Sequence, residues 1–211
     1  MSEIAIGIDI GGTNSRFGVV SDSGEVLHED RFPTKDYPKV EEFVEALSDK
    51  IKKVLAEFDG YTFKGIGVGA PNGNFFSGTI EQAPNLAWKG IVPLVELFNK
   101  YFDVPVVLTN DANAAAIGEM MFGAAKNMKD FILITLGTGL GSGIVVNGDL
   151  VYGHDGFAGE MGHIFVYPAS GRMCGCGRRG CLETYASAKG IKRTMFELLA
   201  SETDESELRE F

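Results

Sequence analysis

Three cysteines and one histidine stand close together in the second half of the chain. The cysteines follow the spacing Cys174-x-Cys176-x4-Cys181, His163 precedes them, and no other cysteine is present. Three thiols within so short a segment do not form a disulfide framework. Thiolates and imidazole bind Zn²⁺ tetrahedrally, and four protein ligands leave no open position for a reactive water. We therefore predict a structural zinc site, with reactive or simply buried thiols as the alternative.

Two carboxylates flank this loop and are candidates for the groups that it positions. Glu160 lies shortly before His163, and Glu183 shortly after Cys181. Solvated surface carboxylates are the alternative interpretation of both.

Two glycine-rich turns offer a second kind of chemistry. Glycine lets backbone N–H groups approach an anion closely, because no side chain stands in the way. The candidate phosphate-binding residues of the first turn are Gly11, Gly12, Thr13 and Asn14, and those of the second are Gly137, Thr138, Gly139 and Gly141. Asp9 would repel a phosphate, so Mg²⁺ is its expected partner. Each turn taken alone could also be an ordinary tight hairpin, and neither matches a P-loop or a dinucleotide fingerprint.

A third candidate is the segment Thr109-Asn110-Asp111, which follows an apolar strand predicted over Val104–Leu108. Ligand groups gather at the carboxyl ends of strands in open α/β sheets. Asp111 is therefore a candidate catalytic carboxylate, and the alternative is an N-cap of the helix predicted over Ala112–Phe122.

The elements that must position these residues include an internal repeat. Residues 4–20 and 130–146 both read as an apolar strand, a glycine-rich turn and a second strand, and each is followed by a polar turn and a third strand. Two such units predict a duplicated fold. Between them, an amphipathic helix is expected over Tyr37–Phe58, a strand over Phe63–Ala70 and a helix over Pro93–Tyr101.

Composition excludes several classes of protein. The chain has 211 residues, 45% of them hydrophobic, and a formal net charge of −10. Such acidity disfavours nucleic acid as a partner, and we expect Arg172, Arg178 and Arg179 to be solvated. No apolar run approaches the ~18 residues of a membrane span. A strand is expected almost at once, at Ile4, which leaves no room for a signal peptide. We expect a cytoplasmic protein.

The expected fold class is α/β, with two domains at residues 1–125 and 126–211. The second domain contains the zinc loop at 163–181 and is expected to be incomplete in this chain.

Six segments together resemble one family. DIGGTN, GAPN, NDANAAAIGE, GTGLGSGI, AGEMGH and CGCGRRGCLE, in this order, are similar to the ROK family of bacterial sugar kinases and sugar-responsive repressors. That family belongs to the actin–hexokinase–Hsp70 superfamily of duplicated ribonuclease-H-like domains with a mixed β-sheet. The resemblance extends from Ile4 to about Ser187.

The resemblance implies roles for individual residues. Asp111 resembles the general base that takes the proton from the 6-hydroxyl of a hexose. The residues that resemble sugar-binding positions are Gly69, Asn85, Asn110, Asp111, Glu160, His163 and Glu183. His163 would contact zinc through one ring nitrogen and sugar through the other. The two glycine turns resemble the pair that binds the phosphates of ATP.

The function implied is ATP- and Mg²⁺-dependent phosphorylation of a hexose. NDANAAA and PNLAWKG look more like glucokinases than like kinases of fructose, allose, N-acetylmannosamine or N-acetylglucosamine, so glucose is the expected substrate. The alternatives are another of these kinases, a sugar-responsive transcriptional regulator, or a zinc-stabilised sugar-binding protein without transferase activity. Family members are often homo-oligomers, which makes self-association a further expectation.

Overall fold

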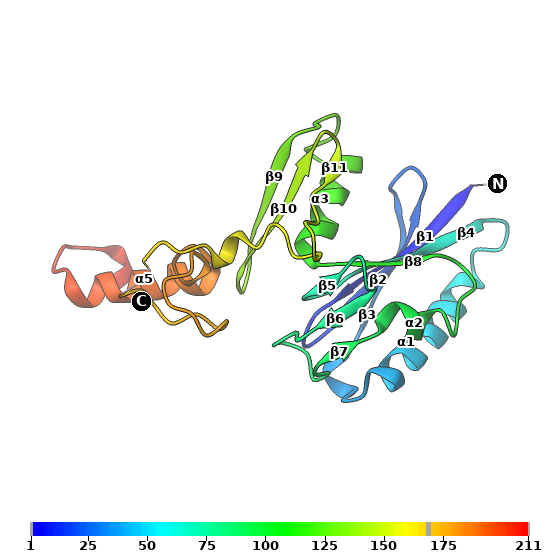
Figure 1. Ribbon diagram of the computed structural model, residues 1–211, viewed down its shortest axis with the longest axis horizontal. Coiled ribbons are helices and arrows are strands. Elements are labelled where there is room, and N and C mark those ends of the chain that lie inside the picture. The colour runs from blue at the N-terminus through cyan, green and yellow to red at the C-terminus, as the bar shows by residue number, and fades with distance from the viewer. Residues whose placement is uncertain (1, 168–169, 211) are drawn as a thin grey trace. The chain divides into compact units, whose positions relative to one another are not determined.

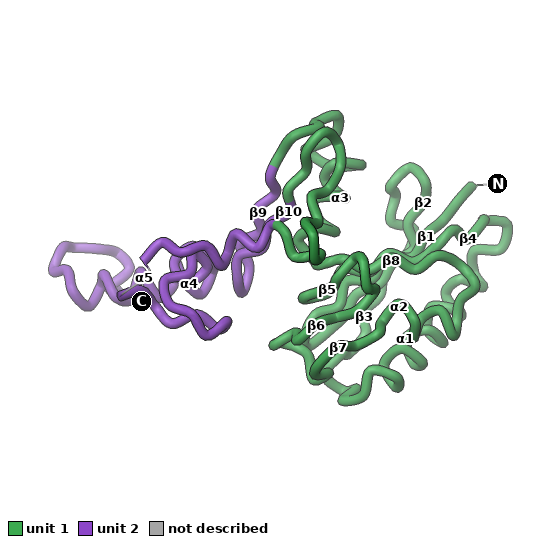
Figure 2. Tube along the Cα trace, viewed as in Figure 1, with its two compact units in different colours: residues 1–131, 144–158 green, residues 132–143, 159–211 purple. Residues whose placement is uncertain are grey.

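The computed structural model describes residues 2–167 and 170–210. The chain forms two compact units, of which unit 1 comprises residues 1–131 and 144–158 and unit 2 comprises residues 132–143 and 159–211 (Figure 2). The division into domains at residues 1–125 and 126–211 stays a prediction.

Unit 1 is built on a five-stranded mixed sheet with the order β3-β2-β1-β4-β8 (Figure 1). Its strands are β1 (Glu3–Ile10), β2 (Ser15–Ser21), β3 (Val26–Phe32), β4 (Thr62–Gly69) and β8 (Val106–Thr109). β1, β2 and β3 pair antiparallel, whereas β4 runs parallel to β1 and β8 runs parallel to β4. The three parallel strands therefore end at one edge of the sheet.

The core of unit 1 lies between this sheet and helix α1 (Val40–Leu55). Burial alternates along β1, so that its isoleucines face the core while Asp9 lies on the other face. The α1 residues that enter the core recur at helical spacing and are Val40, Phe43, Val44, Leu47, Ile51 and Val54. Acidic residues in its first turn and lysines in its last turn also complement the helix dipole.

The single tryptophan of the chain belongs to this core. Trp88 is 5% exposed, its ring centroid lies 4.8 Å from that of Phe43, and its Nε1 donates to the backbone oxygen of Tyr37 over 3.0 Å. The indole is thus packed and hydrogen-bonded at once, which fixes the loop that carries it.

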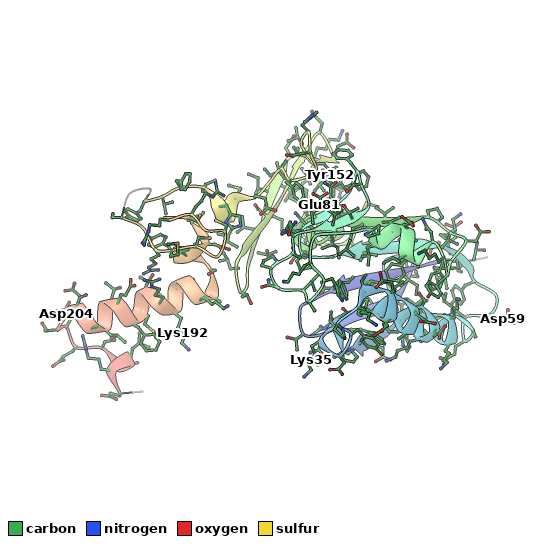
Figure 3. The ribbon with its side chains drawn as sticks, turned by 60° about the horizontal axis from the view of Figure 1, so that its bottom comes forward. Lys35, Asp59, Glu81, Tyr152, Lys192 and Asp204 are labelled. Atoms are coloured by element: carbon green, nitrogen blue, oxygen red, sulfur yellow. The ribbon has the colours of Figure 1, made fainter. Side chains whose placement is uncertain are left out.

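The remaining elements of unit 1 are shorter. They are η1 (Thr34–Asp36), β5 (Gly73–Asn74), β6 (Thr79–Glu81), β7 (Ile91–Val92), α2 (Leu94–Phe98), α3 (Asp111–Phe122) and β11 (Asp149–Leu150). β5, β6 and β7 form an antiparallel sheet. The side chain of Tyr152 stacks on Phe75 beside this sheet, with ring centroids 4.2 Å apart; Figure 3 labels Tyr152 and the β6 residue Glu81.

The second copy of the strand–turn–strand pattern forms a sheet of order β11-β10-β9. The chain enters unit 2 along β9 (Phe131–Leu136) and leaves it along β10 (Leu140–Val146). Unit 2 also contains η2 (Met161–His163), α4 (Glu183–Ala186), α5 (Ala188–Ser201) and η3 (Glu207–Arg209). Both predicted hairpins and both third strands are present, so the repeated strand pattern is confirmed.

The predicted helices and strands exist at their expected places, with ends that differ from the expected ones by a few residues. The helix expected over Tyr37–Phe58 spans Val40–Leu55, and that expected over Pro93–Tyr101 spans Leu94–Phe98. None of the helices in the described part of the chain combines the length and the apolar character that crossing a bilayer requires.

Candidate functional site

The predicted site residues of unit 1 meet at the edge where the parallel strands end. Asp9 on β1 pairs in register with Gly69 on β4, and Gly69 pairs with Thr109 on β8. The segments that follow these strands are the Gly11–Asn14 turn, the Ala70–Pro71 turn and Asn110–Asp111. The structure thus brings together three of the segments singled out from the sequence, as expected for the carboxyl ends of parallel strands.

Gly69 allows these segments to approach closely. A Cβ atom at Gly69 would lie 3.2 Å from Cβ of Ala114 and 3.6 Å from Cα of Asp111. The end of β4 therefore packs directly against the first turn of α3, and any larger side chain would displace Asp111.

Two carboxylates share this edge and influence one another. Desolvation by the surrounding protein raises the pKa of Asp9, the negative charge of Asp111 raises it further, and Arg16 opposes the shift. Facing carboxylates of this kind gain stability when a cation neutralises their charge, and Mg²⁺ prefers such oxygen ligands. The pair fits a magnesium site better than either residue alone.

Asn110, and not Asp111, caps helix α3. The N-cap of α3 is Asn110, whose Oδ1 accepts from the backbone N–H of Asn113 over 2.6 Å. The alternative interpretation of Asp111 as the N-cap is therefore wrong, because the neighbouring amide fills that position. Asp111 is exposed at the first turn of the helix, where the helix dipole favours a negative charge.

The first glycine turn contacts the loop that contains Asn85. A Cβ atom at Gly12 would lie 2.4 Å from the backbone oxygen of Asn85, and one at Gly11 would lie 2.6 Å from the backbone oxygen of Asn14. Both positions consequently require glycine, and the turn is held against a loop that the family resemblance assigns to sugar binding.

Asn113 is a buried polar residue whose role the sequence did not indicate. Its side chain is 1% exposed, and within the described residues neither its Nδ2 nor its Oδ1 has a hydrogen-bond partner. Buried amides are almost always satisfied, so an ordered water or a ligand group is expected beside it. In the sequence Asn113 stands out only as part of NDANAAA, a segment that looks like glucokinases, and the structure adds that its amide is buried.

In unit 2 the second glycine turn lies against Glu183. A Cβ atom at Gly139 would lie 2.7 Å from Oε2 of Glu183, and the backbone oxygen of Gly137 accepts from the N–H of Ala188 over 3.0 Å. The turn is thus fixed to α4 and to the start of α5.

The segment that contains Glu160 and His163 packs on the same hairpin. A Cβ atom at Gly162 would lie 2.3 Å from the backbone oxygen of Leu140, so glycine is required between η2 and β10. His163 is partly buried, whereas Glu160 is exposed.

The four predicted metal ligands form one cluster in unit 2. The ligand atoms of His163, Cys174, Cys176 and Cys181 all lie within 4.8 Å of one another. Sγ of Cys176 lies 3.7 Å from Sγ of Cys181, and Sγ of Cys174 lies 3.7 Å from Nδ1 of His163. Tetrahedral zinc with bonds of about 2.3 Å to sulfur requires edges of about 3.8 Å. The four residues therefore fit a zinc ion.

The thiols differ in their electrostatics. Burial raises the pKa of Cys174 and of Cys181. Desolvation acts in the same direction on Cys176, but hydrogen bonds from Arg178 outweigh it and lower the pKa to about 6. Cys176 is thus the thiolate most readily formed, and a cation bound among the four would stabilise the others.

Glu183 connects this cluster to the glycine turn. Its Oε1 accepts from Sγ of Cys174 over 2.9 Å and lies 3.9 Å from Nδ1 of His163, while its Oε2 faces Gly139. Glu183 is partly buried, so the alternative of a solvated surface carboxylate does not describe it.

Arg172 is largely buried, although it was expected to be solvated. Its side chain is 9% exposed, donates from Nη1 to the backbone oxygens of Thr184 and Gly190 over 2.7 and 3.1 Å, and lies 4.5 Å over the ring of Tyr185. The expectation of a solvated arginine is wrong here because backbone carbonyls of α4 and of the first turn of α5 accept from the guanidinium, whereas Arg178 and Arg179 are exposed as expected.

The predicted residues therefore fall into two sets. The set in unit 1 comprises Asp9, Gly11, Gly12, Thr13, Asn14, Gly69, Asn85, Asn110 and Asp111. The set in unit 2 comprises Gly137, Thr138, Gly139, Gly141, Glu160, His163, Cys174, Cys176, Cys181 and Glu183. Their individual roles stay predictions.

Comparison with known proteins places these features in a family. The sequence model described as "ROK family" matches residues 5–211. The chain is 40% identical over 195 residues to a glucokinase of Halalkalibacterium halodurans, a match that covers 91% of this chain and 59% of that protein. It is 36% identical over 197 residues to a xylose repressor of Caldicellulosiruptor bescii, covering 92% of this chain and 49% of the repressor.

A solved structure of a ROK family protein is also similar to this chain. The crystal structure of a ROK family glucokinase from Streptomyces griseus in complex with glucose and AMPPNP matches with a TM-score of 0.76 and 40% identity, over 94% of this chain and 62% of that one. The chain thus spans less than two thirds of each of these relatives. The predicted fold class, with duplicated ribonuclease-H-like domains and a mixed sheet, is confirmed, and the chain belongs to the ROK family.

Proposed function

We propose that this chain is part of an ATP-dependent sugar kinase that phosphorylates the 6-hydroxyl of a hexose, with glucose as the favoured substrate. The observation that carries the proposal is the meeting of Asp111, Asp9 and the Gly11–Asn14 turn at the carboxyl edge of one sheet. Phosphoryl transfer depends mainly on positioning and charge neutralisation, and this edge offers an acceptor for a proton, a cation site and a phosphate cradle.

Each residue has a definite task in this proposal. Asp111 accepts the proton of the sugar hydroxyl as the oxygen attacks the γ-phosphorus of ATP and ADP leaves. General base catalysis of this kind contributes about 10²–10⁴-fold. Asp9 would hold Mg²⁺, whose charge would offset that of the phosphates, and the proposed role of the glycine turn in each unit is to bind phosphate.

Unit 2 supplies the sugar-binding carboxylates and their support. Glu160, His163 and Glu183 accept hydrogen bonds from sugar hydroxyls or donate to them. His163 and the three cysteines would hold Zn²⁺, which would fix the loop, and Nδ1 is the ring nitrogen that lies 3.7 Å from Sγ of Cys174. This leaves Nε2 of His163 for the sugar, in keeping with the usual division of a ligating imidazole.

The Asp111→Asn variant of the full-length protein tests the proposal. A coupled assay of ADP release should show kcat reduced at least 10²-fold, while glucose still raises the melting temperature. Asp59→Asn is the matched control, because Asp59 is exposed at the opposite end of β4 (Figure 3) and should keep full activity. Loss of sugar binding with unchanged turnover per bound sugar would contradict the assignment of Asp111 as base.

A panel of hexoses and N-acetylhexosamines at fixed ATP identifies the substrate. The expected result is the highest kcat/KM with glucose. The similarity to a xylose repressor supports a second candidate, a sugar-binding regulator without transferase activity. That candidate requires sugar-dependent thermal stabilisation with no ADP release from the wild-type protein.

A further inference from the structure

The backbone at Glu160 adopts a specific tight turn. Glu160 has φ −72° and ψ 55°, and the N–H of Met161 donates to the backbone oxygen of Gly159 over 2.7 Å. These angles and this i→i+2 bond define an inverse γ-turn with Glu160 at its centre. The turn fixes the direction in which the Cα–Cβ bond of Glu160 leaves the backbone, so whatever fixes the turn also influences where the carboxylate can lie.

One hydroxyl contacts both ends of this turn. Oγ of Ser142 donates to the backbone oxygen of Gly159 and accepts from the N–H of Met161 over 3.3 Å. Ser142 is 2% exposed, and although it lies within the GTGLGSGI segment, sequence analysis assigned it no role of its own. It brackets Glu160 without contacting the reacting groups.

Through its position on β10, Ser142 connects the second glycine turn to the Glu160 segment. Ser142 follows the second glycine turn directly and shares a strand face with Leu140, whose backbone oxygen packs on Gly162. Two consecutive same-face positions of β10 therefore hold the segment 159–163. The turn proposed to bind phosphate and the carboxylate proposed to bind sugar belong to one hydrogen-bonded unit.

We infer that Ser142 is a positioning residue that sets the direction of the Glu160 carboxylate and thereby the affinity for sugar. The inference rests on the proposed function, since Glu160 must hold a sugar hydroxyl for its direction to matter. A serine that merely satisfied its own hydroxyl would need one partner, whereas Ser142 uses both its donor and its acceptor on the two peptide groups that flank Glu160.

The test compares Ser142→Ala with the wild-type full-length protein in the kinase assay. The KM for glucose should rise about tenfold, the effect of losing one to two buried hydrogen bonds. The KM for ATP and kcat should stay within about threefold, because the proposed phosphate contacts are made by backbone N–H groups. Ser48→Ala is the matched control, since Ser48 is also fully buried but its Oγ has no partner within the described residues.

A double-mutant cycle with Glu160→Gln distinguishes positioning from general weakening. If Ser142 acts through Glu160, Ser142→Ala should raise the glucose KM, or the dissociation constant measured by calorimetry, only when Glu160 is present. Equal factors in both backgrounds, or an unchanged glucose KM in active Ser142→Ala protein, would overturn the inference alone. A wild-type protein that neither binds nor phosphorylates any hexose would overturn the proposed function, and the inference with it.

The near-isosteric Ser142→Cys variant covers the case in which Ser142→Ala does not fold. A thiol is a weak donor and acceptor, so the glucose KM should again rise at least threefold. A Ser142→Cys protein with wild-type affinity for glucose would contradict the inference.

Discussion

The two units of this chain are stabilised by different means. Unit 1 contains a continuous apolar cluster between its sheet and α1, whose largest fully buried members include Phe17, Phe43 and Phe98. Among the described residues of unit 2, the buried apolar side chains are Leu140, Cys174 and Cys181, and two of these are metal-ligand candidates. Unit 1 therefore folds by burying apolar surface, whereas we expect unit 2 to depend on a metal bound at its cysteine–histidine cluster and on close backbone contacts at glycines.

The apolar side chains of unit 2 support the same contrast. Its exposed large hydrophobic residues are Ile132, Ile134, Leu136, Ile164, Phe165, Val166, Tyr167, Met173, Ile191, Phe196, Leu198 and Leu208. These residues contribute little hydrophobic stabilisation within the unit, because they remain in contact with solvent.

Removal of the metal should have the largest effect and should separate the two units. The Cys181→Ser variant loses a buried thiolate ligand, and structural zinc sites contribute about 10–16 kcal/mol of folding free energy. We expect zinc to be absent from the purified protein by elemental analysis, and limited proteolysis to cut within residues 159–211 while unit 1 stays protected.

The control for this experiment is Ser170→Ala, an exposed change in the same loop. It should keep one zinc ion per chain and the wild-type digestion pattern. Simultaneous unfolding of unit 1 in Cys181→Ser would show that the two units are stabilised together and would break the comparison.

Alanine substitutions of one phenylalanine in each unit should show the next largest difference in the free energy of unfolding. Phe43 in unit 1 is fully buried, whereas Phe196 on α5 of unit 2 is 55% exposed. Phe43→Ala should lower the free energy of unfolding by about 3–5 kcal/mol through the lost burial and the cavity. Phe196→Ala should lower it by less than about 0.5 kcal/mol. Urea denaturation of both variants measures the difference, and equal losses would contradict the contrast.

An ion pair on the surface of unit 1 should have the smallest effect. Lys50 Nζ lies 2.7 Å from Oδ2 of Asp30, and the hydrogen bond from Lys50 holds the pKa of Asp30 below its ordinary value. Because the folded pKa is depressed, the stabilisation exists above the unfolded pKa of about 3.9 and is lost as the pH falls through the folded value. Both side chains are more than a third exposed, which limits the contribution to below about 1 kcal/mol.

Asp30→Asn therefore tests how far charge contributes to unit 1. The variant should be slightly less stable than the wild type at pH 7, and the two should converge at acidic pH, as the pH falls through the folded pKa of Asp30. Denaturation curves at both pH values measure this, and a loss at pH 7 as large as that of Phe43→Ala would contradict the dominance of the apolar core.

The features that sequence analysis predicted correctly are local or repeated. The cysteine spacing predicted the cluster, since three of its four ligands lie on one short loop. Apolar periodicity predicted α1 and β1, and Asp111 lies, as expected, just beyond the carboxyl end of a strand, β8. In these cases neighbouring residues decide the structure.

The features that it missed depend on local backbone geometry or on contacts between distant segments. Two adjacent residues, Asn110 and Asp111, could each cap α3, and only backbone geometry shows that Asn110 does. Ser142 reads as an ordinary polar residue of a glycine-rich strand until the 159–161 turn packs against it. Arg172 reads as a surface residue until α4 and the start of α5 place carbonyls beside it. Partners this far apart in sequence leave no periodic signal.

The fluorescence of the single tryptophan can report on unit 1 selectively. Trp88 is the sole indole, and its buried ring contacts Phe43 in unit 1. Emission excited at the red edge of the absorption band should therefore change when unit 1 unfolds and should not change when only unit 2 unfolds. Because Trp88 lies close in sequence to Asn85, the same emission should shift when sugar is added, with no label attached.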